Sequence, residues 1–331
     1  MSQVREARVE GRGAKHEGRE SAPGRLCPLS YRYSPRVFNR EAEVRADAVY
    51  VVGGLYGNVE ALAALEELVA AEAASTAIVF NGDFHWFDID AADFAEVSAR
   101  VLAHHALRGN VETEIAGDES GAGCGCAYPL DVADAEVSRS NEILDRLRGT
   151  ARLDAALRRK LGALPMHLTA QVGSARVGIV HGDAASLAGW GFAQDQLDKL
   201  SHARWVESMF REARVDVFAS THTCLPALRR FQWAGGAGLV ANNGAAGMPN
   251  FSGTRHGVVT RIALRPFEGA ARLYGAQLAG VHVEAVALDY DHERWVQRFL
   301  AQWPEGSPAH ASYFRRIVEG PRFERARAAG A

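Results

Sequence analysis

The amino-acid sequence predicts an α/β fold in which strands and helices alternate along most of the chain. Short apolar runs rich in β-branched residues, such as Ala48 to Val52 and Thr76 to Phe80, precede longer segments with helical spacing of apolar residues. Several of these runs end directly in glycine, aspartate, asparagine or histidine. Ligands of layered α/β folds bind beyond the carboxyl ends of strands, so the same pattern indicates where a site should lie.

The first part of the chain contains a predicted tail and the beginning of the main domain. Residues 1–25 are rich in Arg, Glu and Gly with almost no apolar periodicity, and we expect a disordered N-terminal tail. The main domain is predicted over residues 26–265. Helices are expected from Val59 to about Ala73 and from Ala91 to His104, and a further strand over 106–108.

The middle of the chain changes character between about residues 117 and 165. A segment rich in Gly and Cys, at 121–126, precedes predicted helices that include 138–147 and 153–161, which suggests an insertion that caps the site. Strand signals then return, interrupted by a predicted helix over 195–213, and residues 266–331 are expected to form a C-terminal extension with a strand at 283–290 and a helix at 293–303. The returning strands are predicted at 168–172, 175–180, 215–219, 227–233, 239–242 and 258–264.

Composition excludes several classes of protein. The 331 residues are 47% hydrophobic and 23% charged, which suits a globular chain with a large core. A net charge of −3 argues against a dedicated nucleic-acid or membrane-surface binder. No run of about 18 apolar residues predicts a membrane span, and the first twenty residues lack the apolar stretch of a secretory signal. Four cysteines form no disulfide-rich pattern, so we expect a cytoplasmic protein. The oligomeric state stays open.

Five short motifs each follow a predicted strand. Alone, a Gly-Asp or Gly-Asn pair is most often a turn. Five such motifs in a fixed order, each after a strand, favour a shared site instead. The motifs are Gly54-Leu55-Tyr56-Gly57-Asn58, Gly82-Asp83, Gly109-Asn110, His181-Gly182-Asp183 and Thr221-His222-Thr223-Cys224-Leu225-Pro226.

In order and spacing these motifs resemble those of the calcineurin-like metallophosphoesterases: D-x-H-G-N, G-D-x-x-D, G-N-H, a lone H, and G-H-x-H-x-P. The segment from Asn242 to Pro249 is similar to the loop that follows the last metal motif in that family. The resemblance covers about residues 48–264. It implies a four-layer α/β/β/α sandwich, in which two mixed sheets face each other and helices cover the outer faces.

The resemblance also implies a metal site. Family members hold two divalent ions about 3.5 Å apart. Asp83, Asn110, His181 and His222 match all four ligands of the second ion. A carboxylate, an amide oxygen and two imidazoles suit Mn, Fe or Zn, so one divalent ion per chain is expected.

The positions for the first ion have changed. Gly54, Tyr56 and Cys224 stand where the family has an Asp and two His. Of these, Cys224 is retained as a candidate ligand, although a free Cys is more often a small buried apolar residue. Trp86 replaces a second Asp, and Val111 replaces the His that helps to protonate the leaving group, a loss that typically costs 10²–10⁴ in rate.

Other residues are candidates to replace these lost groups. His85, two residues beyond Asp83, is the candidate acid. Near the C-terminus His310, Arg315 and Arg316 are candidate substrate-binding residues, because Arg favours bidentate phosphate contacts; a solvated helix with an aromatic inner face is the alternative.

The Cys124-Gly-Cys126 pair allows two interpretations. It would chelate a soft metal together with Cys224, or consist of two unpaired loop thiols.

Two functions are consistent with this pattern. The first is a divergent phosphoesterase that hydrolyses a small phosphomonoester or phosphodiester with a metal-activated water at a one-metal site. The alternative is a catalytically weak or inactive relative that binds a phosphorylated ligand or partner. The missing ligands and the missing acid favour the alternative, whereas the complete second set of ligands favours the enzyme.

Overall fold

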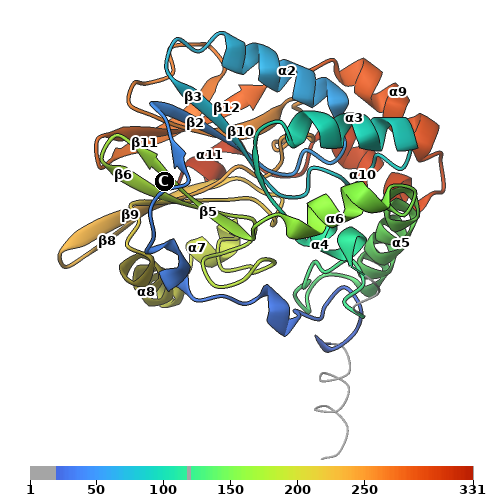
Figure 1. The fold of residues 1–331 in the computed structure, drawn as a ribbon, viewed down its shortest axis with the longest axis horizontal. Coiled ribbons are helices and arrows are strands. Elements are labelled where there is room, and N and C mark those ends of the chain that lie inside the picture. The colour runs from blue at the N-terminus through green and yellow to red at the C-terminus, as the bar shows by residue number, and fades with distance from the viewer. Residues whose placement is uncertain (1–19, 118–120, 331) are drawn as a thin grey trace, which may run out of the picture.

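The computed structural model of the protein describes residues 20–117 and 121–330. Two six-stranded mixed sheets face each other, and helices lie on their outer sides (Figure 1). The strands of the first sheet, in spatial order, are β11 (Arg272–Leu278), β12 (Val281–Leu288), β10 (Gly257–Ala263), β2 (Ala48–Val52), β3 (Thr76–Asn81) and β4 (His105–Leu107). Those of the second sheet are β1 (Val44–Arg45), β5 (His167–Val172), β6 (Ala175–Val180), β7 (Val217–Ser220), β9 (Gly236–Asn242) and β8 (Ala227–Trp233). The predicted α/β/β/α sandwich is confirmed.

The helices fall into three groups (Figure 1). Those that cover the first sheet are α2 (Val59–Ala70), α3 (Ala91–Val101) and α9 (His292–Gln302). Those gathered at one end of the sandwich are α4 (Asn110–Ala116), α5 (Asp134–Ala151), α6 (Ala155–Ala163) and α10 (Pro308–Glu319). Those beside the second sheet are α7 (Gln194–Leu197), α8 (Ala203–Ala213) and α11 (Arg325–Ala329), and short 3-10 turns lie at Leu29–Tyr31, Pro35–Phe38 and Leu200–His202.

The alternation of side chains along β2 explains the layers. Tyr50 and Val52 belong to the apolar cluster formed with α2, α3 and α9. Val49 and Val51 belong instead to the cluster between the two sheets. Successive side chains of a strand point to opposite faces, so a fully apolar strand such as β2 is expected to be buried on both sides.

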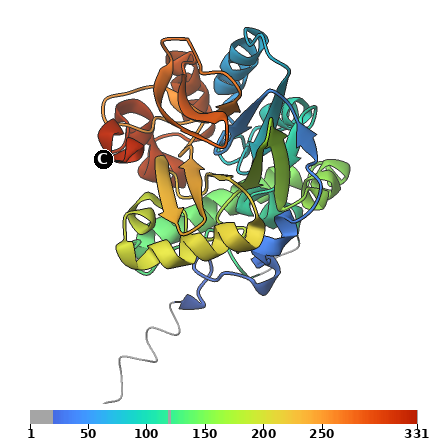
Figure 2. The same ribbon diagram turned by 90° about the vertical axis from the view of Figure 1, so that its left-hand side faces the viewer.

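The second sheet is covered in the same way on its far face. Phe218 of β7 and Val240 of β9 pack with Val206 and Phe210 of α8. Figure 2 shows α8, in yellow, lying along the outer side of this sheet. Each sheet therefore has one helical cover and one face against the other sheet.

Some elements differ from the sequence prediction. The single helix expected over 195–213 is divided into α7, a 3-10 turn and α8, and the strand β11 and helix α4 were not anticipated. Residues 1–19 of the expected tail lie outside the described residues, whereas Arg25 is buried and donates hydrogen bonds to the carbonyl oxygens of Pro129 and Val132. Within the described ranges, no helix has the length and apolar character needed to cross a bilayer.

Two groups of parallel strands position the site. β2, β3 and β4 run parallel in the first sheet, and β6, β7 and β9 run parallel in the second. A hydrogen bond of 2.9 Å joins the ring of His181, just after β6, to the carbonyl oxygen of Asn81 at the end of β3. The carboxyl ends of both groups therefore meet at one rim, where the five motifs lie.

Candidate metal and ligand-binding site

Four side chains from four different loops or helix ends converge at this rim. His181 Nε2 lies 2.9 Å from Asn110 Oδ1, 3.1 Å from His222 Nδ1 and 3.3 Å from Asp83 Oδ2. Potential ligand atoms of Asp83, His181 and His222 all lie within 4.8 Å of one another. The four residues that the motifs indicated as ligands of the second ion are therefore neighbours, and all four are buried.

Their hydrogen bonds determine which atoms face one another. His181 Nδ1 is 2.9 Å from the carbonyl oxygen of Asn81, and His222 Nε2 is 3.1 Å from that of Cys126. A carbonyl oxygen only accepts, so these two ring nitrogens donate; when each imidazole is neutral, its other ring nitrogen carries the lone pair. Asn110 donates through Nδ2 to the carbonyl oxygen of Cys124, which leaves its Oδ1 facing the imidazoles.

The cluster thus consists of acceptors that face one another. With both imidazoles neutral, as metal binding requires, two lone pairs, an amide oxygen and a carboxylate oxygen face one another, which is costly in a buried place unless a cation or a proton on His181 lies among them. Burial, together with the neighbouring His181, lowers the pKa of His222 to about 3, so this imidazole stays neutral as a metal ligand must. For His181 burial alone would lower the pKa, but the Asp83 carboxylate outweighs burial and raises it. The donor set fits a divalent transition-metal ion.

The supporting backbone is closely fitted. Gly109 lies against the cluster, because a Cβ there would meet Asp83 Oδ1 and would come within 2.9 Å of the His181 ring. Glu112, fully buried, accepts hydrogen bonds from the main-chain N–H groups of Gly109, Asp83, Phe84 and His85. The Glu112 carboxylate therefore ties the loop after β3 to the start of α4. Glu112 is not among the site residues predicted from the sequence. Its position three residues after Gly109, at the start of a helix, is the pattern that could have indicated this role.

Gly54, Tyr56 and Cys224 stand at the positions that correspond to the first-ion ligands of the resembled family. Tyr56 Oη lies 3.0 Å from Cys224 Sγ, and both side chains line the same space as Asp83. Burial raises the pKa of both the Tyr56 phenol and the Cys224 thiol, so neither is a ready anionic ligand near neutral pH. Cys224 does not belong to the group of converging ligand atoms among the described residues.

His85 lies away from the site. Its ring is buried, with Nδ1 2.6 Å from Asp88 Oδ2, Nε2 2.9 Å from Ser98 Oγ and one face stacked on Phe94. Both ring nitrogens have protein partners, and His85 does not line the cavity next to the ligands. The structure thus places the residue that the sequence suggested as the acid outside this cavity.

Of the three C-terminal candidates, one reaches the site. Arg316 lines the cavity and donates hydrogen bonds to the carbonyl oxygens of Cys224 and Pro249. Arg315, on the next position of α10, points to solvent and pairs with Glu319 at 2.8 Å. His310 stacks on Phe314 and does not line the cavity.

The Gly/Cys segment of the insertion supports the ligands through its main chain. Cys124 and Cys126 are joined as a disulfide, so they do not offer thiolates to an ion. Their carbonyl oxygens accept from Asn110 and His222, as described above, and Trp190 Nε1 also donates to Cys126 O at 3.1 Å. These partners fix the orientation of two candidate ligand side chains, Asn110 and His222, as partners of metal ligands generally do.

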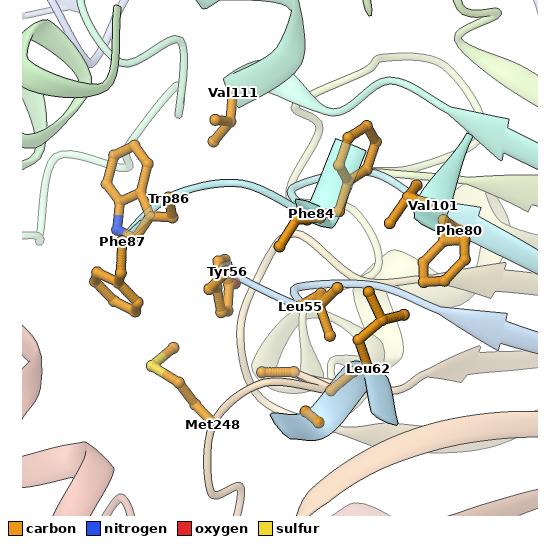
Figure 3. Packing of buried hydrophobic residues seen from close by; sticks show 14 of the residues in the cluster. Leu55, Tyr56, Leu62, Phe80, Phe84, Trp86, Phe87, Val101, Val111 and Met248 are labelled. Carbon is orange, nitrogen blue, oxygen red and sulfur yellow. The ribbon is translucent and has the colours of Figure 1, made fainter. Parts of the chain in front are cut away.

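A cavity of about 270 Å³ adjoins the ligands. Its walls contain a high proportion of aromatic side chains, and Figure 3 shows Tyr56, Trp86 and Val111 grouped about one space. The lining residues are Tyr56, Asp83, Trp86, Asn110, Val111, Cys126, Tyr128, Glu136, Trp190, His222, Thr223, Cys224, Ser312, Tyr313 and Arg316.

Comparisons with known proteins support the fold. No protein-family profile and no curated protein sequence matches the chain. Among solved structures, it is similar to a hypothetical protein from Pyrococcus horikoshii (TM-score 0.56, 15% identity, covering 85% of this chain and 100% of that one). It is also similar to a metallophosphoesterase from Sphaerobacter thermophilus (TM-score 0.52, 16% identity, covering 83% and 100%). At this low identity the likeness shows the fold alone: the chain has the α/β/β/α fold of the Sphaerobacter metallophosphoesterase.

Proposed function

We propose that the protein is a phosphoesterase that uses one divalent metal ion, held by Asp83, Asn110, His181 and His222. The observation that carries this proposal is the convergence of three buried groups, Asn110 Oδ1, His222 Nδ1 and Asp83 Oδ2, on His181 Nε2, within 2.9 to 3.3 Å. A divalent ion at such a place supplies a Lewis acid for a phosphoryl oxygen and lowers the pKa of water.

The residues around this point would bind and orient a phosphoester. Arg316 is a permanently charged donor on the cavity wall, and its guanidinium is held by main-chain carbonyls, with no carboxylate partner among the described residues. It is therefore the side chain best suited to bind the phosphoryl group. Thr223 and Ser312 offer hydroxyl groups on the same walls.

The experiment compares hydrolysis and metal binding in matched variants. Asp83→Ala and His222→Ala are each expected to abolish Mn²⁺ binding measured by calorimetry and any hydrolysis of phosphomonoesters and phosphodiesters. Arg316→Ala should raise KM at least tenfold, whereas Arg315→Ala, its solvent-facing neighbour, should leave KM unchanged. Full activity in Asp83→Ala or His222→Ala would refute the proposal.

A second candidate function is a binding protein with little or no catalysis. Among the described residues the cavity walls include no histidine besides His222, and Val111 stands where the resembled family has its acid. Burial also raises the pKa of the cavity's Tyr56 and Cys224, which makes them poor proton donors near neutral pH. Binding of Mn²⁺ and a phosphonate without turnover of any ester would favour this candidate.

A further inference from the structure

The side chains that differ from the resembled family all line one cavity. Tyr56 and Cys224 stand where the family has two histidines, Trp86 replaces an aspartate, and Val111 replaces the acidic histidine. All four line the cavity beside Asp83 and His222. All four differences therefore make the cavity wall less polar: in each, an aromatic, aliphatic or thiol group stands where the family has a polar or charged side chain.

Aromatic rings contributed by other parts of the chain complete these walls. Tyr313 of α10 meets Trp86 edge to face, with ring centroids 6.5 Å apart at 85°. Tyr128 from the insertion lies 6.1 Å from Trp190, and Trp190 meets the ligand His222 edge to face at 5.4 Å. The insertion and the C-terminal extension thus both supply rings to one cavity, which has the metal ligands at one end.

The size of the cavity limits its occupant. About 270 Å³ lies just below the range of about 300–1,000 Å³ typical of sites for drug-sized ligands. A phosphoryl group at the ligand end leaves space for one small apolar group between the aromatic walls. Aromatic rings pack favourably on one another at centroid separations of about 4.5–7 Å, so a single planar ring suits these walls.

The chemistry of the walls points to the same kind of group. Glu136, a second carboxyl group on these walls, is paired with Arg139, and the family's acidic histidine is replaced by Val111. When no general acid protonates the leaving group, an ester is cleaved readily only if that group departs as a stable anion. A phenol has a pKa of about 10, whereas an alcohol resembles water, at 15.7. A phenolate therefore needs far less help from a proton donor than an alkoxide does.

We propose that the substrate is a small aryl phosphoester, whose ring occupies the cavity between Trp86, Tyr313 and Trp190 while its phosphoryl group faces Asp83, His222 and Arg316. Hydrolysis breaks the P–O bond to the ring; water supplies the hydroxyl that joins phosphorus, and the aryl oxygen leaves as phenolate and is protonated by solvent. This inference rests on the proposed function.

The test compares two non-hydrolysable probes on the full chain loaded with Mn²⁺. Phenylphosphonate should bind at least about tenfold more tightly than methylphosphonate by calorimetry, which corresponds to about 1.4 kcal/mol. Trp86→Leu and Tyr313→Ala should each reduce that ratio to threefold or less. Trp233→Leu, a matched change on β8 where Trp233 stacks on Phe210, should leave it unchanged.

The outcomes separate the two proposals. Equal affinity for both phosphonates, with Mn²⁺ bound, would overturn the aryl inference and leave the metal site intact. If the wild-type chain binds no Mn²⁺, or binds neither phosphonate, both the proposed function and the aryl inference are overturned. A peptide with phosphotyrosine that binds more than tenfold better than phenylphosphonate would also overturn it, by showing that the partner is a protein.

Discussion

At the scale of single residues, the site is marked by unusual backbone conformation. Tyr56, Asp83, His222 and Cys224 all have positive φ, between 52° and 59°. They are four of the seven non-glycine residues with positive φ in the described part of the chain. Such conformations cost free energy and gather at functional sites, where the surrounding structure enforces them. The loops after β2, β3 and β7 are therefore bent to present these side chains to one cavity.

Gly54 provides a test of how closely the Tyr56 ring packs against the loop after β2. It has a φ of +64°, and a Cβ there would lie 2.9 Å from the Tyr56 ring. Gly54→Ala should lower the free energy of unfolding by about 1–2 kcal/mol for the left-handed backbone alone. The contact of the new Cβ with the Tyr56 ring should lower it further. Urea titration measures the change.

Gly235 supplies the control for this prediction. Its φ is +88°, and nothing lies within 4 Å of a Cβ built there. Gly235→Ala should show the backbone cost only, and Tyr56→Ala should remove the extra cost at Gly54. If Gly54→Ala and Gly235→Ala cost the same, Tyr56 does not fill the place of the first ion as tightly as described.

At the scale of elements, a buried ion-pair network joins three strands and the end of α2. Arg261 of β10 contacts Glu72 at 2.8 Å and Glu284 of β12 at 3.0 Å, and Arg272 of β11 contacts Glu284 at 2.7 Å. The side chains of Arg261 and Glu284 are almost completely buried, whereas that of Arg272 is 43% exposed.

The two arginines should differ in their effect on stability. Arg261→Ala leaves buried carboxylates without their main partner and should destabilise the fold by about 3–5 kcal/mol. Arg272→Ala removes a partly exposed pair and should cost less than about 1 kcal/mol. Equal losses in urea unfolding would contradict this account of how the C-terminal strands are attached to the first sheet.

The sequence predicted most elements because their signals are local. The strand at 48–52 has the predicted limits, and four ligands follow strands whose ends meet at one rim. Which way a loop side chain points is not local information. His85 is only two residues from Asp83, yet its ring turns into the core between Asp88 and Phe94. Arg315 and Arg316 are likewise adjacent in sequence and face opposite surroundings.

Other contacts depend on segments far apart in the chain. Residues of the insertion orient Asn110 and His222 through carbonyl oxygens of Cys124 and Cys126, and main-chain groups have no sequence signature. The position of α10 beside α5, which brings Tyr313 to the cavity, follows from packing of the whole helical end (Figure 1).

At the scale of the whole molecule, the two halves of the site differ in kind. One half has four buried acceptors supported by hydrogen bonds from main-chain and side-chain partners. The other half has the Tyr56–Cys224 pair and aromatic walls contributed by the insertion and the C-terminal segment. The fold brings both halves to the rim between the two sheets, and the insertion contacts both, through the carbonyl oxygens of Cys124 and Cys126 and through the ring of Tyr128.

The most direct test of this division is the number of metal ions bound per chain. Elemental analysis of protein loaded with Mn²⁺ and then desalted should give one ion per chain in the wild type and one in Cys224→Ala. His181→Ala should give none, because His181 Nε2 contacts the three other ligands. Two ions in the wild type, or an ion retained in His181→Ala, would contradict the one-metal site.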